Sequence, residues 1–365
     1  MQSRNILGLI FCNSGDEMLP ELTSVRAIGS VPFGCRYRLV DFSLSSMVNA
    51  GISKVGLITK RNYQSLADHV GNGRPWDLAR KNGGLSILSP YVFGGTGLYT
   101  GRIDALSGCM QYLEKSREEY VVLTNANIIA NVDFDAMIDQ HLALNADVTI
   151  AYKKGLQGSK YLKMDGDKIL EIASKEEAGT DNCYIDLFLI RRELLISMIK
   201  EAAVHNYTNL TEDVLKRQVK SYNYYGFGID GYVRIIDGMQ SYFDGNMDLL
   251  HKSVRDQLFK MDAPIYTKLR DDMPSRYGFD SGVADSVIAD GCVIEGEVHN
   301  SIIFRGVTVE KGAKLENCII MQSGVIHANA QLSYVVADKN VSIKEGRTLM
   351  GCKTFPMVIG KGLTV

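Results

Sequence analysis

The first residues that could do chemistry lie in a loop that follows an apolar run near the amino terminus. The run covers residues 7–11, and the loop reads Cys12-Asn13-Ser14-Gly15-Asp16-Glu17-Met18-Leu19. A loop that holds phosphates brings several backbone N–H groups close to the anion, which requires glycines, and usually adds a cation. This loop has one glycine, Gly15, and two carboxylates, Asp16 and Glu17, which would repel a triphosphate. The residues alone therefore favour an ordinary acidic turn.

Two arginines and two histidines are the next candidates. Arg36 and Arg38 carry guanidinium groups that bind phosphate or sulfate in a bidentate manner, and an ion pair with an acid such as Asp41 explains them equally well. His299 and His327 invite comparison with hexapeptide-repeat acyltransferases that use a histidine base, but surface histidines are the simpler interpretation. We therefore take the arginines as candidates for binding an anionic effector.

The composition argues against several classes of function. Seven Cys are scattered without C-x-x-C or C-x-x-H spacing, so we expect a reduced, cytoplasmic protein without structural zinc. The 40 Lys and Arg and the 42 Asp and Glu give a formal charge of -2 with no long basic run, so we expect no nucleic-acid partner. The apolar run near the amino terminus is too short to cross a membrane, and no membrane association is expected.

Short apolar runs alternate with helical patterns in the first two thirds of the sequence. This alternation predicts strands and crossover helices on a mainly parallel sheet. The expected strands cover residues 7–11, 54–58, 120–124, 148–152 and 184–190. The expected helices cover residues 40–50, 102–115, 133–145, 192–203, 211–221 and 238–246.

An apolar residue returns about every six positions in the last third of the sequence. The series includes Ile288, Ile294, Ile303, Val309, Leu315, Ile320, Ile326, Leu332, Ile343 and Leu349. This period predicts a three-sided parallel β-helix, for which an antiparallel sandwich is the alternative. Pro264, Pro274 and Gly278 interrupt regular structure before it. We therefore predict a first domain at 1–255, a connecting segment at 256–280 and a β-helix at 281–365.

The segment after the acidic loop carries a family resemblance. It contains Arg26-Ala27-Ile28-Gly29-Ser30-Val31 and then Gly34-Cys35-Arg36-Tyr37-Arg38-Leu39-Val40-Asp41-Phe42-Ser43-Leu44-Ser45. It resembles the ADP-glucose pyrophosphorylases, or glucose-1-phosphate adenylyltransferases, which read R-A-K-P-A-V and G-G-x-x-R-x-I-D-F-x-L-S-N here. The resemblance continues through residues 49–52, 99–105 and 246–250. It implies an α/β, Rossmann-like (GT-A-like) nucleotidyltransferase domain with a mainly parallel mixed sheet, followed by a left-handed β-helix of hexapeptide repeats.

Members of that family transfer an adenylyl group from ATP to glucose 1-phosphate and release pyrophosphate. The reaction requires cations on the phosphates and Mg²⁺ held by carboxylates. At the matching positions the loop arginine is Met18, the R-A-K-P lysine is Ile28, and the two metal aspartates are Asn127 and Ile235. The resemblance therefore implies no catalytic residues in this chain and no bound cofactor, with Mg²⁺ and ATP held by a catalytic partner.

The positions that face glucose 1-phosphate in the family are better kept. Gly101 and Asp104 remain of the G-T-A-D-A motif, in which Arg102 replaces threonine, and Lys175 remains of E-K-P. With Arg36 and Arg38 they are the candidates for binding a sugar phosphate or an anionic effector.

The pattern resembles the GlgD-type subunit of this family. The resemblance implies a noncatalytic or regulatory subunit, a pseudoenzyme that acts in glycogen biosynthesis within a heterotetramer. Two alternatives stay open: an active nucleotidyltransferase with a rearranged metal site that uses Asp237, and a free-standing sugar-phosphate sensor.

Overall fold

A nine-stranded mixed sheet forms the centre of the first domain in the computed structural model, which describes residues 5–89 and 101–365. Tyr99 and Thr100 of the family motif lie outside the described residues. In spatial order the strands are β5 (Gly84–Leu88), β4 (Lys54–Ile58), β1 (Ile6–Phe11), β6 (Tyr120–Asn125), β11 (Asn182–Arg191), β8 (Val148–Lys154), β12 (Tyr224–Gly228), β10 (Lys168–Ala173) and β9 (Tyr161–Asp165). The pairings make β10 and β11 antiparallel to the other strands, which confirms a mainly parallel mixed sheet.

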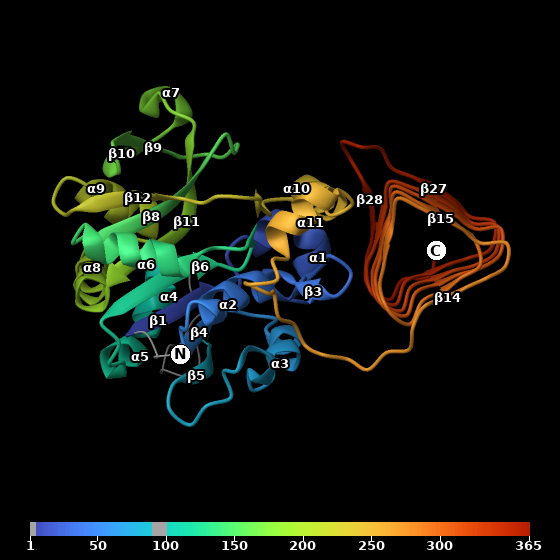
Figure 1. Ribbon diagram of the computed structural model, residues 1–365, viewed down its shortest axis with the longest axis horizontal. Coiled ribbons are helices and arrows are strands. Elements are labelled where there is room, and N and C mark those ends of the chain that lie inside the picture. Colours follow the sequence, from blue (N-terminus) through green and yellow to red (C-terminus); the bar gives the residue numbers. More distant parts are fainter. Residues whose placement is uncertain (1–4, 90–100) are drawn as a thin grey trace.

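Helices cover both faces of the sheet (Figure 1). Alternate residues of β1 point to opposite faces, so Leu7 and Leu9 pack with one set of helices and Ile10 with the other. The first set is α4 (Arg102–Gly108), α5 (Met110–Lys115) and α8 (Arg192–Val204). The second set is α2 (Leu39–Asn49), α3 (Gln64–Val70) and α6 (Phe134–Ala143).

The remaining short elements lie around this core. They are α1 (Pro20–Thr23), α7 (Lys175–Ala178), α9 (Lys216–Gln218), α10 (Met239–Asp248), α11 (Lys252–Leu258), the strand pairs β2 (Pro32–Phe33) with β3 (Tyr37–Arg38) and β7 (Ile128–Ala130) with β13 (Val233–Ile235), and 3-10 turns at Asp16–Met18, Ile28–Ser30 and Arg74–Trp76.

Two predicted helices differ from the observed ones. The helix expected at 102–115 is broken at Cys109 into α4 and α5, directly after Gly108, a residue with low helix propensity. The helix expected at 211–221 consists of a π-helical turn, Leu210–Leu215, followed by α9. Asn209 caps that turn because its side-chain oxygen accepts hydrogen bonds from Thr211 N and Glu212 N. The five predicted strands are confirmed, with ends that shift by a few residues.

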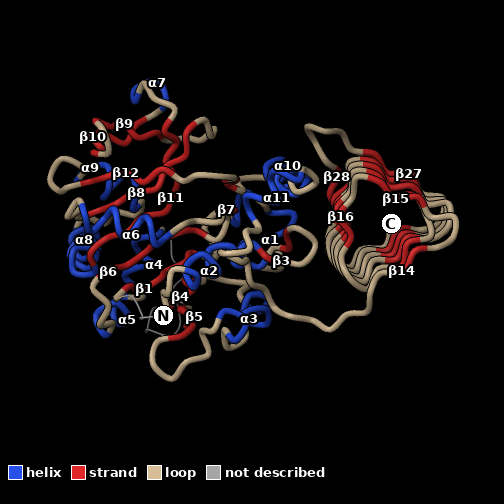
Figure 2. The backbone as a smooth tube through the Cα atoms, in the orientation of Figure 1, coloured by secondary structure: helices blue, strands red, loops and turns tan. Residues whose placement is uncertain are grey.

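Three five-stranded parallel sheets form the walls of a triangular, left-handed β-helix (Figure 2). The first sheet holds β14 (Arg276–Tyr277), β17 (Val293–Ile294), β20 (Thr308–Val309), β23 (Val325–Ile326) and β26 (Ser342–Ile343). The second holds β15 (Gly282–Ala284), β18 (Glu297–His299), β21 (Lys314–Glu316), β24 (Gln331–Ser333) and β27 (Thr348–Met350). The third holds β16 (Val287–Ile288), β19 (Ile302–Ile303), β22 (Ile319–Ile320), β25 (Val335–Ala337) and β28 (Met357–Ile359).

The six-residue period is the period of the interior of this β-helix. Ile294, Ile303, Ile320 and Ile326 are fully buried in one cluster that fills it. Because every pairing between coils is parallel, the antiparallel sandwich is wrong. Asn and Gly stand at several corners with positive φ, for example Asn317 at 52°, a conformation that both residues tolerate.

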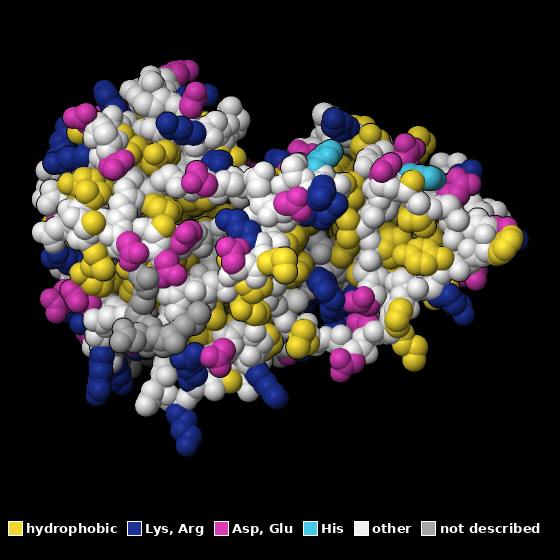
Figure 3. Space-filling model, in the orientation of Figure 1, with side chains coloured by type: hydrophobic (Ala, Val, Ile, Leu, Met, Phe, Trp, Pro, Cys, Tyr) yellow, Lys and Arg dark blue, Asp and Glu magenta, His cyan; other side chains and the backbone are white. Residues whose placement is uncertain are grey.

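The third sheet of the β-helix packs directly against the first domain. Phe304 and Ile319 share one buried cluster with Phe33 and Tyr242. The chain reaches the β-helix through an irregular segment between α11 and β14, drawn in orange in Figure 1. None of the helices among the described residues is long and apolar enough to cross a membrane. On the face shown in Figure 3, basic and acidic side chains are interspersed over both domains.

Candidate functional site

A cavity of about 860 Å³ opens where the carboxyl ends of central strands meet. Such an edge is where ligands bind in open α/β sheets. Three of the four altered family positions, Met18, Asn127 and Ile235, line this cavity. The fourth, Ile28, is fully buried beside it, with its methyl carbon near Gly15. The lining residues are Met18, Asn125, Asn127, Ile128, Gly155, Leu156, Gln157, Gly158, Ser159, Lys160, Tyr184, Asp186, Thr211, Val233, Arg234, Ile235, Asp237 and Ser241.

The acidic loop beside the cavity is held by its own side chains. Asp16 Oδ1 accepts a hydrogen bond from Ile28 N at 2.8 Å, and Asp16 Oδ2 accepts one from Asn13 Nδ2 at 2.6 Å. Asn13 Oδ1 also accepts from Lys60 N at 2.7 Å. Burial raises the pKa of Asp16 to about 6, against the effect of these hydrogen bonds. Met18, which stands where the family resemblance implies a phosphate-binding arginine, is 56% exposed and lines the cavity.

The two lost metal positions lie next to each other. Asn127 joins β6 to β7, and β7 pairs with β13 so that Ile235 faces Ile128. The Asn127 amide Nδ2 donates to the Ile236 carbonyl at 2.9 Å. This side chain therefore links the β6–β7 turn to the end of β13, while its Oδ1 is buried without a hydrogen-bond partner.

The remaining carboxylates do not form a divalent-cation site. Among the described residues that line the cavity, Asp186 and Asp237 are the carboxylates. Asp186 is already paired with Arg102. Within 5–89 and 101–365 no group of three His, Cys, Asp or Glu side chains could hold a metal ion. Two amide oxygens in the cavity, Asn125 Oδ1 and Asn127 Oδ1, are buried without a hydrogen-bond partner, but they bring no negative charge. Mg²⁺ at phosphate sites is usually held by one or two carboxylates, so this cavity fits the ion less well than a site with two aspartates would.

Arg102 and Asp186 are the centre of a partly buried polar cluster. Arg102 stands where the family has threonine, its guanidinium lies 4.4 Å from the centre of the Phe11 ring, and it pairs with Asp186. Asp186 also accepts from Tyr184 Oη and Asn125 Nδ2, both at 2.8 Å. Burial raises the pKa of Asp186, but Arg102 and these hydrogen bonds outweigh it and hold the pKa below its ordinary value. Arg102 and Asp186 thus neutralise each other's charge beside the cavity.

Two cations that the sequence did not single out also line the cavity, and each has a carboxylate partner. Lys160 Nζ lies 2.8 Å from Glu212 Oε1, and Arg234 pairs with Asp248. A phosphate entering the cavity would compete with these carboxylates. The partners are distant in sequence, so no local motif could have indicated the pairs.

The predicted sugar-phosphate residues do not converge. Gly101 borders a smaller pocket of about 150 Å³ next to Arg102 and Lys60, and a Cβ there would lie 2.4 Å from the Thr208 carbonyl oxygen. Asp104 lies in the first turn of α4. Lys175 lies in α7, about half exposed, where its Nζ pairs with Asp181 Oδ1 at 3.0 Å. Lys175 is not among the residues that line either pocket.

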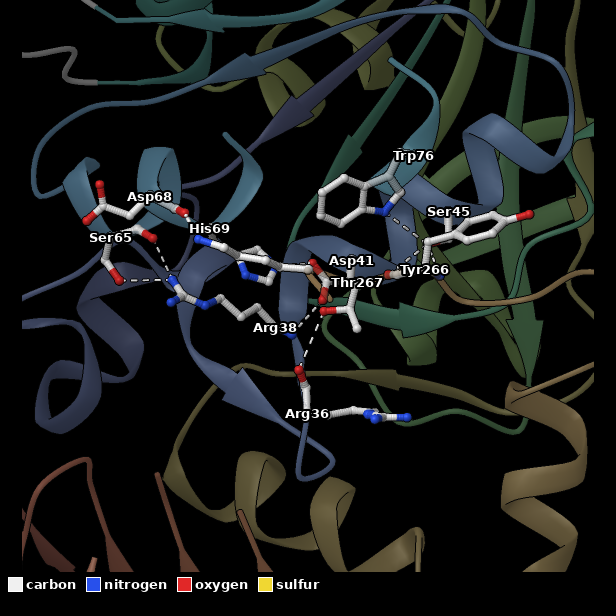
Figure 4. A network of polar contacts seen from close by, with 11 residues as sticks. Arg36, Arg38, Asp41, Ser45, Ser65, Asp68, His69, Trp76, Tyr266 and Thr267 are labelled. Carbon is white, nitrogen blue, oxygen red and sulfur yellow. Dashed lines mark hydrogen bonds and ion pairs between the residues drawn. The ribbon is translucent and has the colours of Figure 1, made fainter. Parts of the chain in front are cut away.

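Arg36 and Arg38 point in different directions (Figure 4). Arg38 Nη1 donates to Ser65 Oγ at 2.9 Å, and burial lowers the pKa of Arg38 to about 10. Asp41 accepts from the Arg38 backbone N at 2.9 Å, and its other oxygen lies 2.6 Å from His69 Nε2. Arg36 pairs with Asp290 of the β-helix at 3.0 Å, with both side chains about half exposed. The two guanidinium groups therefore do not form a joint bidentate site.

A second cationic cluster lies between the domains. Burial and the nearby charges of Arg38 and Arg26 lower the pKa of Lys339 to about 7. Arg26 is neutralised by Asp338 through a buried bidentate pair, with distances of 2.9 and 2.7 Å. Arg38 and Lys339 are thus neighbours, and the charges of Asp41 and Asp68 also act on Arg38.

The two histidines of the β-helix lie outside these pockets. His299 is exposed on β18. His327 follows β23, with Nδ1 at 3.0 Å from Glu310 Oε1 and Nε2 at 3.2 Å from Ser342 Oγ. The seven thiols are all unpaired, and six of them are buried.

The fold and the cavity define the class of protein as a nucleotidyltransferase domain joined to a hexapeptide β-helix. Family models agree: residues 14–175 match a nucleotidyl transferase family, and residues 273–353 match the GlmU-like C-terminal hexapeptide family.

Comparison with curated proteins gives the particular family. The glycogen biosynthesis protein GlgD of Bacillus subtilis is 33% identical over 364 residues, which is 100% of this chain and 98% of that protein. GlgD of Geobacillus stearothermophilus is 35% identical over 85% of this chain and 83% of its own length. A glucose-1-phosphate adenylyltransferase of Acetivibrio thermocellus is 32% identical over 100% of this chain and 89% of its own length. The chain belongs to the glucose-1-phosphate adenylyltransferase family, and it is similar to GlgD members of that family.

Proposed function

We propose that this chain is a noncatalytic, regulatory subunit of a glucose-1-phosphate adenylyltransferase in glycogen biosynthesis. The observation that carries the proposal is the state of the lost metal position. Asn127 there donates its amide N–H to the Ile236 carbonyl, and Ile235 lies opposite Ile128, the residue that follows Asn127. Divalent cations are best held by carboxylates, and at these two positions the chain offers an uncharged amide, whose Oδ1 is buried without a hydrogen-bond partner, and an alkyl side chain.

The nucleotide side of the cavity supports the same proposal. Transfer of an adenylyl group requires cations that neutralise the phosphates in the transition state. Met18 and Ile28 carry no charge, and Asp16 and Glu17 add negative charge to the loop. Arg102, Lys160 and Arg234 pair with Asp186, Glu212 and Asp248. This distribution of charge supports a noncatalytic role for a chain whose scaffold is that of the family.

The partner in this proposal is a catalytic chain of the same family, which would hold ATP and Mg²⁺, within a heterotetramer. The β-helix supports assembly because its end coils present strands that pair on one side only: β14, β15 and β16 pair with β17, β18 and β19. Unpaired strand edges are ready sites for contact with another chain. The names of the GlgD relatives place those proteins in glycogen biosynthesis.

The effector in this proposal is a small phosphorylated anion that binds between the domains. Arg38 and Lys339 supply the charge, and the burial of Lys339 gives an anion a neighbour whose charge it would stabilise. The site would join the two domains, so its occupancy could bias how the β-helix is presented to a partner.

The proposal is tested with the catalytic chain of the same source, purified alone and together with this chain. Native mass spectrometry measures whether the two assemble, and ADP-glucose synthesis is assayed with and without fructose 1,6-bisphosphate as the anionic probe. We expect a stable mixed oligomer whose synthesis rate or response to the probe differs from that of the catalytic chain alone. Detection of the two chains only as separate species, with unchanged kinetics on mixing, would overturn the regulatory role.

A further inference from the structure

The acidic loop carries its own anion in a position that faces a backbone amide. Asp16 Oδ1 lies 2.8 Å from Ile28 N, and Asp16 Oδ2 is held by Asn13 Nδ2 at 2.6 Å. A carboxylate held by a backbone N–H and a side-chain amide has the contacts that loops of this kind give to a phosphate oxygen. The backbone carbonyl of Asp16 is fixed too, because Thr23 Oγ1 donates to it at 2.6 Å.

We propose that Asp16 is an internal anion that occupies an oxyanion site between its own loop and the Ile28 segment and keeps exogenous phosphates out. The inference deepens the proposed noncatalytic function and rests on it, because it explains how the site is closed and not only which groups are missing. Other amides of the loop turn inward as well: Met18 N donates to Gly15 O and Asp16 N to Asn13 O. The loop is thus a closed structure, held by its own carboxylate.

The backbone amide of Ile28, which faces Asp16, belongs to a segment that is anchored to the β-helix. Ile28 is fully buried, and two residues before it Arg26 forms the bidentate pair with Asp338 of the β-helix. Both side chains of that pair are at most 2% exposed. Because the Ile28 segment is anchored in this way, removal of the Asp16 carboxylate should leave the amide in place and free to bind another anion.

The test follows the Ile28 backbone amide by ¹⁵N–¹H NMR while inorganic phosphate is added to the full-length chain. Asp16→Gly vacates the site. Glu17→Gln is the matched control, because it also removes one negative charge from the loop but does not remove the contact to Ile28. Asp16→Asn is a second variant that keeps a weaker, uncharged acceptor, and the spectra themselves report whether each variant folds.

We expect the Ile28 amide of the natural chain and of Glu17→Gln to be insensitive to phosphate. In Asp16→Gly it should shift saturably, with an affinity at least about tenfold above that of Glu17→Gln. A shift of equal size in the natural chain, or no shift in folded Asp16→Gly and Asp16→Asn, would overturn the inference. These results leave the proposed function untouched, since that stands or falls with ADP-glucose synthesis.

Discussion

Asn127 and Ile236 are joined by two hydrogen bonds that run in opposite directions. Asn127 Nδ2 donates to Ile236 O at 2.9 Å, and Ile236 N donates to Asn127 O at 2.9 Å. The pair connects the β6–β7 turn to the end of β13, so the former metal position now stabilises the wall of the cavity.

Asn127→Asp should therefore destabilise the protein instead of restoring a metal site. A carboxylate cannot donate to the Ile236 carbonyl, and its charge would face that oxygen in a buried place. We expect a loss of about 1–3 kcal/mol in the free energy of unfolding, measured by urea denaturation. Asn72→Asp is the control, because Asn72 uses its oxygen to accept from Arg74 N and an aspartate accepts equally well. An Asn127→Asp variant as stable as the control would contradict this role.

The two ion pairs between the domains should differ strongly in their contributions. Asp338→Asn removes one partner of the buried pair with Arg26 and should cost about 3–5 kcal/mol, because Arg26 is left buried with an unpaired charge. Asp290→Asn breaks the half-exposed pair with Arg36 and should cost about 0–1 kcal/mol. Calorimetry of the two variants makes the comparison. Equal losses would show that burial does not decide the contribution of either pair.

The raised pKa of Asp16 should make the free energy of unfolding depend on pH. Since burial raises the pKa of Asp16 to about 6 in the folded state, the ionised carboxylate costs stability at neutral pH. That cost falls away as the pH drops through about 6, because the folded state then binds a proton that the unfolded state does not yet bind. We expect the natural chain to gain stability relative to Asp16→Asn between about pH 7.5 and pH 5. A difference that does not change with pH would contradict the burial of this carboxylate.

An anion bound between the domains should bind more weakly as the pH rises through about 7. In the free protein, burial, Arg38 and Arg26 lower the pKa of Lys339 to about 7, with Lys361 adding to the effect and Asp338 opposing it. Binding of an anion favours charged Lys339 and therefore takes up a proton. Titration calorimetry with sulfate in two buffers of different ionisation enthalpy measures the uptake. Lys339→Ala should abolish it and exposed Lys344→Ala should keep it, whereas retention in Lys339→Ala would place the anion elsewhere.

The sequence predicted those parts of the fold that rest on a repeated local constraint. A β-helix interior admits only stacked aliphatic side chains, so residues such as Ile303 and Ile320 repeat where the coil requires them. The buried strands could also be predicted from the sequence because each is a short apolar run, as in β1 and β4. The break at Cys109 and the π-helical turn before α9 depend on tertiary packing and leave no such pattern.

The site was predicted less completely. Alignment with family motifs indicated Met18, Asn127 and Ile235, which the structure places around one cavity. It also indicated Lys175, which pairs with Asp181 outside the cavity. Lys160 lines the cavity, but it is held by Glu212, 52 positions away in the numbering, and a contact of that kind is a property of the folded chain.

The most direct test of the noncatalytic assignment is ADP-glucose synthesis by this chain alone, with saturating ATP, Mg²⁺ and glucose 1-phosphate. The Acetivibrio thermocellus glucose-1-phosphate adenylyltransferase, 32% identical, is the positive control. We expect product from the control and none above background from this chain or from its Asp237→Asn variant. Synthesis by this chain at a rate comparable to the control, lost in Asp237→Asn, would contradict the account and show that Asp237 holds the metal in a rearranged site.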